Sequence, residues 1–300
     1  SAMSGIAGFT QERILADEVT LSVHRGGQGV PLVLLHGYPQ NHMAWAKVAP
    51  ELARHFDVIV PDLRGYGASD VPDDDAGHRA YAKRTMARDI VALLDALGIG
   101  RAHVIGHDRG ARVAYRLALD HPGRVDRLGI CEVVPTSDFW RSWTADLAMA
   151  AYHWTFLAQP APLPERMIGA DPAGYLDWTL ASWSLAGDLS AFPEAALASY
   201  RAQMADPARC AAMCADYRAG ATTDRADDEA SRAEGRRIAA PLHFLHAEAG
   251  FPATTGNAEG LWAPWAERLT VSTCRTGHFT MEEDPEAFLR AFLPHLSGAD

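Results

Sequence analysis

The sequence predicts an α/β fold in which a mostly parallel sheet is covered by helices on both faces. In the first half of the chain, short and almost continuously apolar segments alternate with amphipathic helical segments. Strands buried on both faces of a parallel sheet have this composition. The pattern changes near residue 137, and the alternation returns only near residue 241. We therefore expect a core of residues 1–136 and 236–300, with residues 137–235 inserted as a helical cap.

Individual elements can be placed from apolar periodicity and from turn or capping residues. Strands are expected, in chain order, at residues 19–27, 30–37, 56–65, 102–106, 124–135, 241–250 and 269–278. Helices are expected in the core at residues 86–100, 111–122 and 284–296. The first of these helices has apolar residues on one face and is followed by Gly98. The last has Asp284 as its N-cap and Pro285 at its first position.

Composition excludes several function classes. The formal net charge is -11 and no basic stripe is present, so we expect no nucleic-acid partner. No run of 18 apolar residues occurs, and the first residues lack a secretory pattern, so we expect no membrane span and no secretory leader. The cysteines form no CxxC pair and are expected to be reduced thiols; they are Cys131, Cys210, Cys214 and Cys274. These features predict a cytoplasmic protein without a metal centre or cofactor.

The segment Gly-His-Asp-Arg-Gly, residues 106–110, lies between an expected strand and an expected helix. A strand, a turn of the form Gly-x-nucleophile-x-Gly and a helix make a nucleophile elbow, which lifts the central side chain above the sheet. Asp108 occupies the central position. The start of the following helix favours negative charge there. A surface turn that happens to contain an acid is the alternative, and the order of the other motifs favours the elbow.

Two further motifs provide an oxyanion hole and a base. "LLHGYPQN" ends an early strand, and the backbone N–H groups of Tyr38 and Arg109 can then point at one developing oxyanion. His278 directly follows the last strand, from which it can reach over the sheet to Asp108 and act as a base. A satisfied structural histidine is the alternative for an isolated His, but the position of His278 in the strand order favours catalysis.

The acid that orients His278 has two candidates. Glu132 lies at the end of the apolar segment "LGICEVVP", where a lone acid is costly unless it is paired. Glu248 lies in "LHAEAGF", but the usual acid position one turn on is Gly250. We prefer Glu132 and keep Glu248 as the alternative.

An aspartate nucleophile indicates a particular reaction type. A carboxylate is already ionised at neutral pH and can displace a leaving group from a saturated carbon, which forms an ester on Asp108. Water activated by His278 would then hydrolyse this ester, with the oxyanion hole stabilising the intermediate. Carbon–halogen cleavage and epoxide opening fit this chemistry, whereas an ordinary serine esterase does not.

With these residues, the chain resembles the α/β-hydrolases that have an Asp nucleophile, and within them the fluoroacetate (haloacetate) dehalogenases. The matching features are "HGYPQNHMAW", "PDLRGYGASD", "GHDRGARVAYRLALDHP", the pair "HW" and the late "GHF", which together span nearly the whole chain. The resemblance implies an α/β-hydrolase fold with a helical cap, a small anionic haloacid substrate and a homodimer. One departure is Glu132, where these dehalogenases have Asp.

Arg109 follows the nucleophile directly, and Arg112 lies three residues further on. Both guanidinium groups can share one side of the first helical turn and clamp a carboxylate, which would aim its α-carbon at Asp108. Solvation is the alternative for Arg112. The family assigns both arginines to carboxylate binding.

The resemblance also implies halide-binding residues in the cap, and these correspond to His153, Trp154 and Tyr217. Imidazole, indole and phenol groups can donate hydrogen bonds to a leaving halide. Trp183 is a candidate lining residue of the substrate route, with core packing as its alternative.

The sequence predicts conversion of a 2-haloacetate, with fluoroacetate as a candidate, to glycolate and halide. An epoxide hydrolase is the second possibility, because the cap offers the tyrosines that such chemistry uses: Tyr152, Tyr175, Tyr200 and Tyr217. A non-catalytic ligand-binding protein of the same fold is the third. The preference for fluoride or chloride is left open.

Overall fold

The computed structural model describes residues 2–299. Within them, nine strands form one sheet in the order β1-β2-β3-β5-β4-β6-β7-β8-β9. The pairs from β1 to β5 are antiparallel, and those from β5 through β4 to β9 are parallel. The strands are β1 Ala2–Met3, β2 Thr10–Ala16, β3 Val19–Gly26, β4 Val30–Leu35, β5 Phe56–Pro61, β6 Ala102–His107, β7 Val125–Cys131, β8 Leu242–Ala247 and β9 Leu269–Cys274.

Helices surround this sheet. The α-helices are α1 Ala49–Leu52, α2 Lys83–Ala96, α3 Arg109–Asp120, α4 Thr136–Arg141, α5 Ala145–Ala150, α6 His153–Phe156, α7 Leu163–Gly169, α8 Pro172–Ser182, α9 Glu194–Ala205, α10 Pro207–Ala221, α11 Thr223–Ala233, α12 Phe251–Thr254, α13 Ala258–Trp262, α14 Thr280–Glu283 and α15 Pro285–Ser297. The 3-10 helices are η1 His42–Trp45, η2 Arg79–Tyr81, η3 Pro122–Arg124 and η4 Ala263–Trp265. None of the helices described between residues 2 and 299 combines the length and apolar character of a membrane span.

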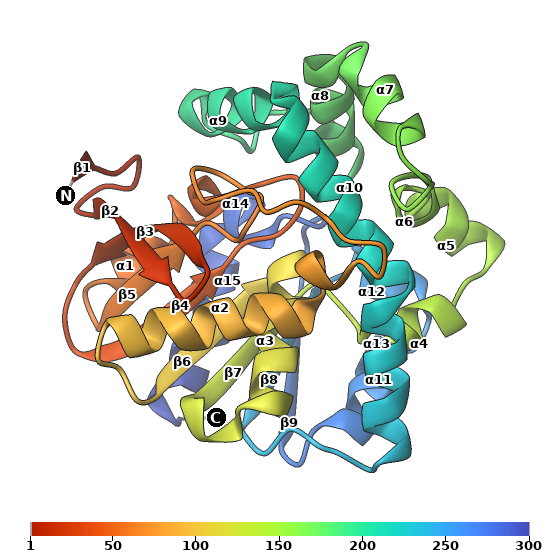
Figure 1. Cartoon of the computed structure of the whole chain (residues 1–300). Coiled ribbons are helices and arrows are strands. Elements are labelled where there is room, and N and C mark those ends of the chain that lie inside the picture. The colour runs from red at the N-terminus through yellow and green to blue at the C-terminus, as the bar shows by residue number, and fades with distance from the viewer. Residues whose placement is uncertain (1, 300) are drawn as a thin grey trace.

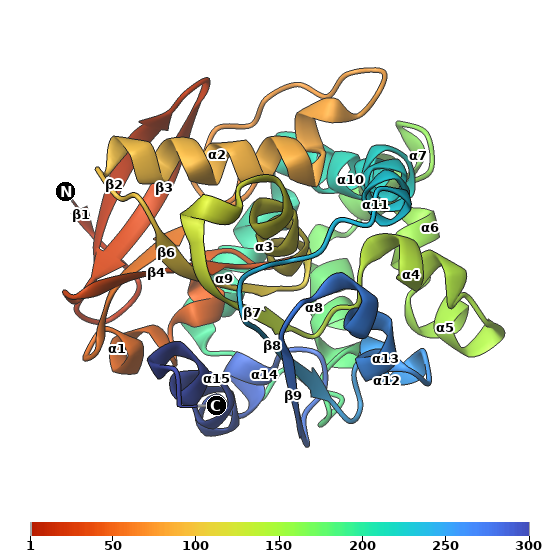
Figure 2. The ribbon, with the colours of Figure 1, turned by 90° about the horizontal axis from the view of Figure 1, so that it is seen from below.

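The predicted α/β class is confirmed, and both faces of the central strands are buried. Along β4, Leu32 and Leu34 join one apolar cluster, whereas Val33 and Leu35 join another. Figure 2 shows α2 and α3 on one side of the sheet and α1 and α15 on the other. Because successive side chains of a strand point to opposite faces, a strand between two helical layers must be apolar throughout.

All the strands and core helices predicted from the sequence are present, with shifted ends. β7 stops at Cys131, so Glu132 lies just beyond the strand rather than within it. The prediction omits β1 and β2, which pair only with antiparallel neighbours at one end of the sheet. β2 reads "TQERILA" and is largely exposed, so it lacks the apolar pattern of a buried strand. The four cysteines are free thiols, and all of them are buried.

The helices α4–α11 lie between β7 and β8, where the sequence predicts a helical cap. We refer to α4–α11 as the helical insertion. In Figure 1, α8, α9 and α10 lie above the sheet, and α10 runs down toward the core helices. α9 contacts η1, which precedes β5 in the chain, and α10 contacts η2, which follows it, so the insertion touches the core at two separate segments.

A buried polar cluster joins the insertion to the core. Gln40 Nε2 donates a hydrogen bond of 2.5 Å to Glu282 Oε2, and Tyr200 of α9 donates one of 3.1 Å to the same oxygen. Gln203, also on α9, donates to the backbone carbonyls of Pro39 and Gln40. Burial raises the pKa of Glu282 to about 8, since these neutral donors only partly offset the loss of water.

Glu282→Gln should therefore change how stability depends on pH. A carboxyl group with a raised folded pKa favours the folded state below its unfolded pKa of 4.5, and this advantage is lost as pH rises toward about 8. In this range, the free energy of unfolding of the wild type should fall by on the order of 1 kcal/mol per pH unit relative to the variant. Urea unfolding at several pH values measures this difference, and parallel curves would contradict it.

Candidate active site

Asp108 lies at the turn between β6 and α3 and is the N-cap of α3. Its backbone has φ 53° and ψ -126°, a conformation that a residue with a side chain rarely adopts. Such strain persists only where the surrounding structure enforces it, and it is common at functional sites. The structure therefore forms the elbow that the sequence predicts.

Both predicted oxyanion donors point at the carboxylate of Asp108. Tyr38 N lies 2.9 Å from Asp108 Oδ2, and Arg109 N lies 2.7 Å from the same oxygen. Oδ2 therefore occupies a preformed pocket of two backbone N–H groups. The other oxygen, Oδ1, is left facing His278.

His278 lies between two carboxylates. Its Nε2 is 3.0 Å from Asp108 Oδ1, and its Nδ1 is 3.3 Å from Glu132 Oε2. Glu132 also accepts a hydrogen bond from Ala247 N at the end of β8. The backbone N–H of His278 donates to Trp183 O of the insertion at 2.8 Å. The structure thus brings the predicted nucleophile, base and acid into one chain of hydrogen bonds.

The structure favours Glu132 over Glu248 as the partner of His278. Glu248 is exposed, and its carboxylate lies 3.9 Å from Arg275. The Glu132 side chain fills the space beside Gly250, where a Cβ would lie 2.0 Å from Glu132 Oε2. An acidic side chain at position 250 and the present Glu132 would therefore compete for the same space. Glu132 itself has φ 67°, which aims its side chain from the end of β7 toward His278.

Burial and charge set the protonation of this triad. Burial alone would raise the pKa of Asp108, but the hydrogen bond and charge of His278 hold that pKa well below its usual range. Burial alone would lower the pKa of His278, but Asp108 and Glu132 raise it to about 9. Burial raises the pKa of Glu132, and the hydrogen bond and charge of His278 partly offset this rise. At neutral pH, Asp108 is therefore ionised and His278 carries a proton.

Arg109 is fully enclosed beside the nucleophile, with an exposed fraction of 1%. Its Nη1 lies 3.4 Å from Asp216 Oδ1, and its guanidinium carbon lies 3.8 Å from the centre of the Tyr217 ring. Nε and Nη2 are buried, and no residue between 2 and 299 forms a hydrogen bond with either of them. These two atoms form the side edge of the guanidinium, which matches the two oxygens of a carboxylate. A complete bidentate donor is thus available next to Asp108.

Arg112 is also buried, and it faces the same tryptophan as Arg109. Its Nη1 donates to Val134 O at 2.9 Å and to Thr136 Oγ1 at 3.0 Å. The guanidinium carbons of Arg112 and Arg109 lie 4.6 and 4.8 Å from the centre of the Trp154 ring. Burial, followed by the charge of Arg109, lowers the pKa of Arg112. The structure therefore brings both arginines of the predicted clamp together.

The residues predicted to bind halide form an aromatic cluster above these groups. The ring of Tyr217 lies 5.3 Å from that of His153 and 6.2 Å from that of Trp154. His153 Nδ1 and Tyr217 Oη are buried without hydrogen-bond partners. Burial lowers the pKa of His153 well below its ordinary value, so its ring is neutral. Unpaired polar groups in a buried site are costly, so these two groups are available to a bound polar molecule.

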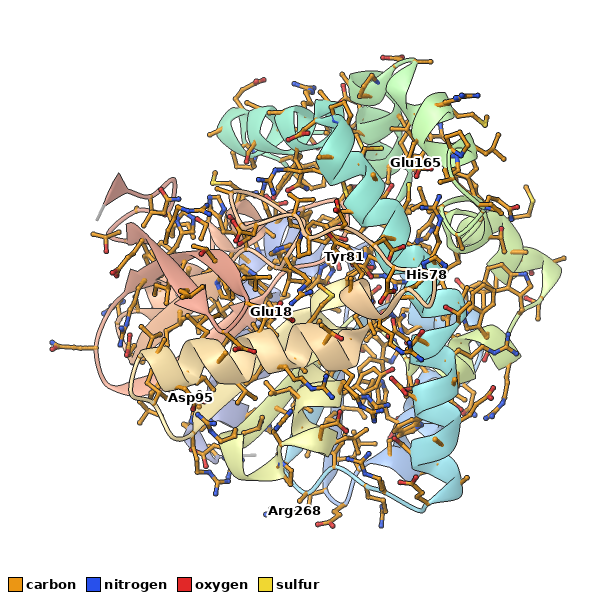
Figure 3. The ribbon with its side chains drawn as sticks, in the orientation of Figure 1. Glu18, His78, Tyr81, Asp95, Glu165 and Arg268 are labelled. Atoms are coloured by element: carbon orange, nitrogen blue, oxygen red, sulfur yellow. The ribbon has the colours of Figure 1, made fainter. Side chains whose placement is uncertain are left out.

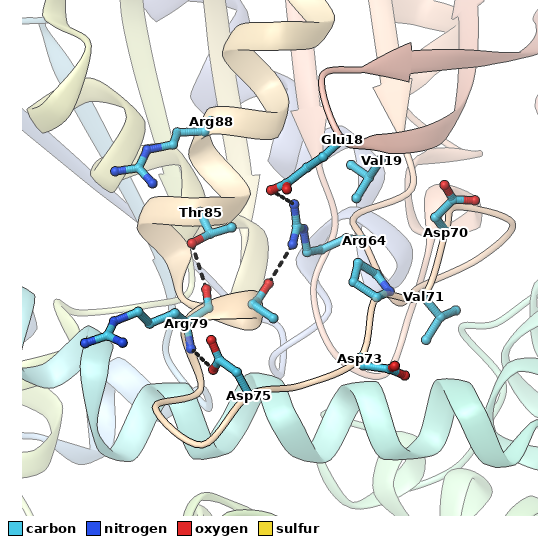
Figure 4. A pocket seen from close by; sticks show the side chains of 12 residues that line it. Glu18, Val19, Arg64, Asp70, Val71, Asp73, Asp75, Arg79, Thr85 and Arg88 are labelled. Carbon is cyan, nitrogen blue, oxygen red and sulfur yellow. Dashed lines mark hydrogen bonds and ion pairs between the residues drawn. The ribbon is translucent and has the colours of Figure 1, made fainter.

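Trp183 lines a cavity of about 180 Å³ that also reaches His278 and Phe251. Trp183 also belongs to the main apolar cluster, so its position on a substrate route stays a prediction beside core packing. A cavity of about 690 Å³ lies elsewhere, at the start of α2, and contains none of the predicted site residues (Figure 4). Its buried cation, Arg64, is already paired with Asp89 at 2.6 Å and with Glu18 at 3.7 Å.

A group of possible metal ligands lies outside this site, in residues His24, His42 and Asp62. The two imidazole rings are stacked 3.7 Å apart with planes only 13° from parallel. Imidazole lone pairs lie in the ring plane, so the two rings do not aim at one ion. Asp62 already accepts from both His42 N and His42 Nδ1 at 2.8 Å. His42 and Asp62 therefore form a hydrogen-bonded pair, with His24 stacked on His42, and this geometry does not suit a metal ion.

Asp216 is the site residue that sequence reasoning missed. It lies in α10 within "CAAMCADYRAG", directly before Tyr217, and is fully buried. The available signal was an acid in an apolar helical segment, which is costly unless it is paired. Its partners, Lys83 and Tyr66, come from distant segments that no local pattern connects with α10.

Gly250→Ala should destabilise the protein by about 1–3 kcal/mol, because the added methyl group overlaps the Glu132 carboxylate. Gly123→Ala is the matched control, since a Cβ there meets no atom within 4 Å; its effect should stay within about 0.5 kcal/mol. In a Glu132→Ala background, Gly250→Ala should cost much less, because its clash partner is gone. Urea unfolding measures all four variants, and equal costs in both backgrounds would refute the packing argument.

Comparisons with known proteins agree with this geometry. Residues 30–283 match the model of the alpha/beta hydrolase fold family. The chain is 38% identical to fluoroacetate dehalogenase of Burkholderia sp. over 97% of its length and 95% of that protein. It is 33% identical to soluble epoxide hydrolase of Corynebacterium sp. (strain C12), over 87% of each. The crystal structure of ALR0039 from Nostoc sp. PCC 7120 superposes with a TM-score of 0.92 at 41% identity, covering 96% of this chain and 98% of that one. With its elbow, its parallel sheet and this match over most of its length, the chain belongs to the alpha/beta hydrolase fold family.

Proposed function

We propose that the protein is a haloacetate dehalogenase that hydrolyses a 2-haloacetate, with fluoroacetate as a candidate, to glycolate and halide. The observation that carries this proposal is the unpaired Nε and Nη2 edge of Arg109, buried beside an ionised Asp108. This pair supplies a carboxylate-binding fork and an oxygen nucleophile for the adjacent carbon in one turn of the chain. The 38% identity to a fluoroacetate dehalogenase supports the same substrate class.

In the first step, Arg109 and Arg112 hold the substrate carboxylate, and Asp108 Oδ1 attacks the α-carbon. The new C–O bond forms as the carbon–halogen bond breaks, and the halide leaves with both electrons of that bond. His153, Trp154 and Tyr217 supply N–H and O–H donors for the halide, in place of water. Asp108 is suited to this attack because its pKa is held far below neutrality, so it needs no base.

In the second step, the Asp108 ester is hydrolysed. Ester formation removes the negative charge of Asp108, which is one of the two charges that raise the pKa of His278. The pKa of His278 therefore falls when the ester forms, so His278 can lose its proton to solvent and then take a proton from the attacking water. Water attacks the ester carbonyl carbon, and the oxyanion develops at Oδ2, which Tyr38 N and Arg109 N already bind. Glu132 stabilises the imidazolium that forms. The intermediate then collapses, the bond between Cγ and Oδ1 breaks, and glycolate leaves with the proton returned by His278, which regenerates the Asp108 carboxylate.

The helical insertion would act as the cap of this enzyme, and we propose residues 137–235 as the cap and residues 1–136 and 236–300 as the core. The Trp183 cavity is the proposed access route, because it reaches His278 from the insertion. The homodimer and the cytoplasmic location stay predictions.

An epoxide hydrolase is the second candidate. Two tyrosines of the insertion, Tyr152 and Tyr175, have hydroxyl oxygens 3.1 Å apart, and Tyr152 lines the same cavity as His278. The identity to the Corynebacterium enzyme favours the same candidate. The buried and unpaired edge of Arg109 weighs against it, since a neutral epoxide offers no partner to that charge. A non-catalytic binding protein is less consistent with an aligned nucleophile, base and acid.

Incubation with fluoroacetate and with chloroacetate tests the proposal directly. The wild type should release halide and glycolate, and Asp108→Asn should lose roughly 10³-fold or more of this activity while keeping its circular dichroism spectrum. Halide-selective detection and glycolate quantification provide the readout. No halide from either substrate, or faster diol formation from a neutral epoxide, would reject the haloacetate assignment.

His278→Ala should trap the covalent intermediate. Without His278, the charge of Arg109 and the backbone N–H groups of Tyr38 and Arg109 still stabilise the Asp108 carboxylate for attack. No base then activates water, so the protein should gain the mass of one carboxymethyl group per chain after exposure to chloroacetate. Peptide mass spectrometry should place this group on Asp108. The control is the double variant Asp108→Asn, His278→Ala, in which the adduct should be absent. An unmodified His278→Ala protein would show that attack itself requires His278.

A further inference from the structure

We propose that Asp216, held by Lys83 and Tyr66, is a positioning residue that orients Arg109 toward the substrate carboxylate. This inference rests on the proposed function. It adds a group of the helical insertion that does not touch the substrate but determines which edge of Arg109 is presented to it.

Asp216 is built into a fixed place on α10. Its Oδ1 lies 2.7 Å from Lys83 Nζ and 3.4 Å from Arg109 Nη1, and its Oδ2 accepts a hydrogen bond of 2.8 Å from Tyr66. Asp216, Tyr66 and Arg109 are almost fully excluded from solvent, and Lys83 is only 3% exposed. Three partners on one buried carboxylate leave it little freedom to rotate.

Lys83 is anchored in turn at the start of α2. Its Nζ donates to Tyr81 O at 2.8 Å and to Asp224 Oδ2 at 2.9 Å. Figure 3 shows Tyr81 where η2 meets α10, so the lysine lies at the junction of core and insertion. Asp224 contacts the lysine but is not among the groups that contact Arg109. The two acids therefore share one lysine, and only Asp216 reaches the arginine.

One turn of α10 surrounds the guanidinium of Arg109 on two sides. Asp216 contacts its Nη1, and the ring of Tyr217 covers its face with a separation of 3.8 Å. Gly220 lies one turn on, where a Cβ would come within 2.9 Å of Nη1. Because Asp216 occupies Nη1 and the Tyr217 ring covers one face of the guanidinium, the group cannot turn freely. Its Nε and Nη2 edge therefore stays available.

The charge distribution keeps Arg109 attractive to an anion. The closest partner of Asp216 is Lys83, at 2.7 Å, whereas Arg109 lies at 3.4 Å. Part of the negative charge of Asp216 is therefore neutralised by the lysine, and Asp216 orients Arg109 without fully compensating it. Arg112 donates to neutral oxygens of Val134 and Thr136, so its charge also remains for the substrate.

Asp216→Asn, compared with Asp224→Asn, tests the inference. Each variant removes one acid from Lys83, but only the first removes the acid that contacts Arg109. For chloroacetate, Asp216→Asn should raise KM by roughly tenfold, with a much smaller change in kcat. Its affinity for acetate, an unreactive carboxylate, should fall by a similar factor in calorimetry. Asp224→Asn should leave both quantities within about twofold, even if the melting temperatures of the two variants are equally lowered.

Tyr66→Phe keeps the assay informative if Asp216→Asn does not fold. It removes one hydrogen bond from Asp216 without a charge, so KM should rise in the same direction by a smaller factor. If Asp216→Asn and Asp224→Asn both fold, equal KM values for the two variants would overturn the positioning role. If Asp216→Asn does not fold, an unchanged KM in Tyr66→Phe would overturn it. If the wild type releases no halide but binds acetate, the proposed function is rejected. The role of Asp216 is then tested by comparing the acetate affinities of the wild type and the variants. No halide and no acetate binding would reject both.

Discussion

The buried negative charge of Asp108 is the constraint on which the rest of the site depends. An isolated carboxylate in the protein interior is costly, so it must be surrounded by donors and positive charge. Tyr38 N and Arg109 N bind one of its oxygens, and His278 contacts the other. The strained backbone of Asp108 aims the side chain at all three. The same groups that make the ionised nucleophile tolerable are those that would stabilise the oxyanion and deliver water, so stability and chemistry have one structural cause.

The core and the insertion make different contributions to the site. The core holds the reacting groups at strand ends, where a parallel sheet gathers them at one edge. The insertion provides the enclosure: Trp154 lies against both arginines, and Tyr217 covers Arg109. Removing water in this way strengthens the attraction between the arginines and an anion. Among the described residues, Tyr217 Oη is left without a hydrogen-bond partner, so it is free to donate to a bound molecule.

The local patterns were sufficient for much of the site. The elbow could be predicted because a strand, a tight turn and a helix are consecutive in the chain, and His278 because it lies in the loop just after the last strand. The choice between Glu132 and Glu248 was harder, since both are acids near strand ends. It depends on which side chain turns inward, and the positive φ of Glu132 and the space beside Gly250 answer that question. β2 was missed because an exposed antiparallel strand carries no apolar pattern.

The sequence by itself determined the fold class, and it predicted Asp108 as the nucleophile, His278 as the base and a pair of arginines beside them, because these follow from short-range periodicity, turn chemistry and residue type. Only the tertiary structure decided which polar groups are paired and which are left free. Lys83 and Asp216 are 133 residues apart, and Glu132 and His278 are 146 apart. Such pairings arise when the sheet and the insertion pack together, so no local signal encodes them. The free edge of Arg109 is defined by this long-range packing, since it is what remains after Asp216 has taken Nη1.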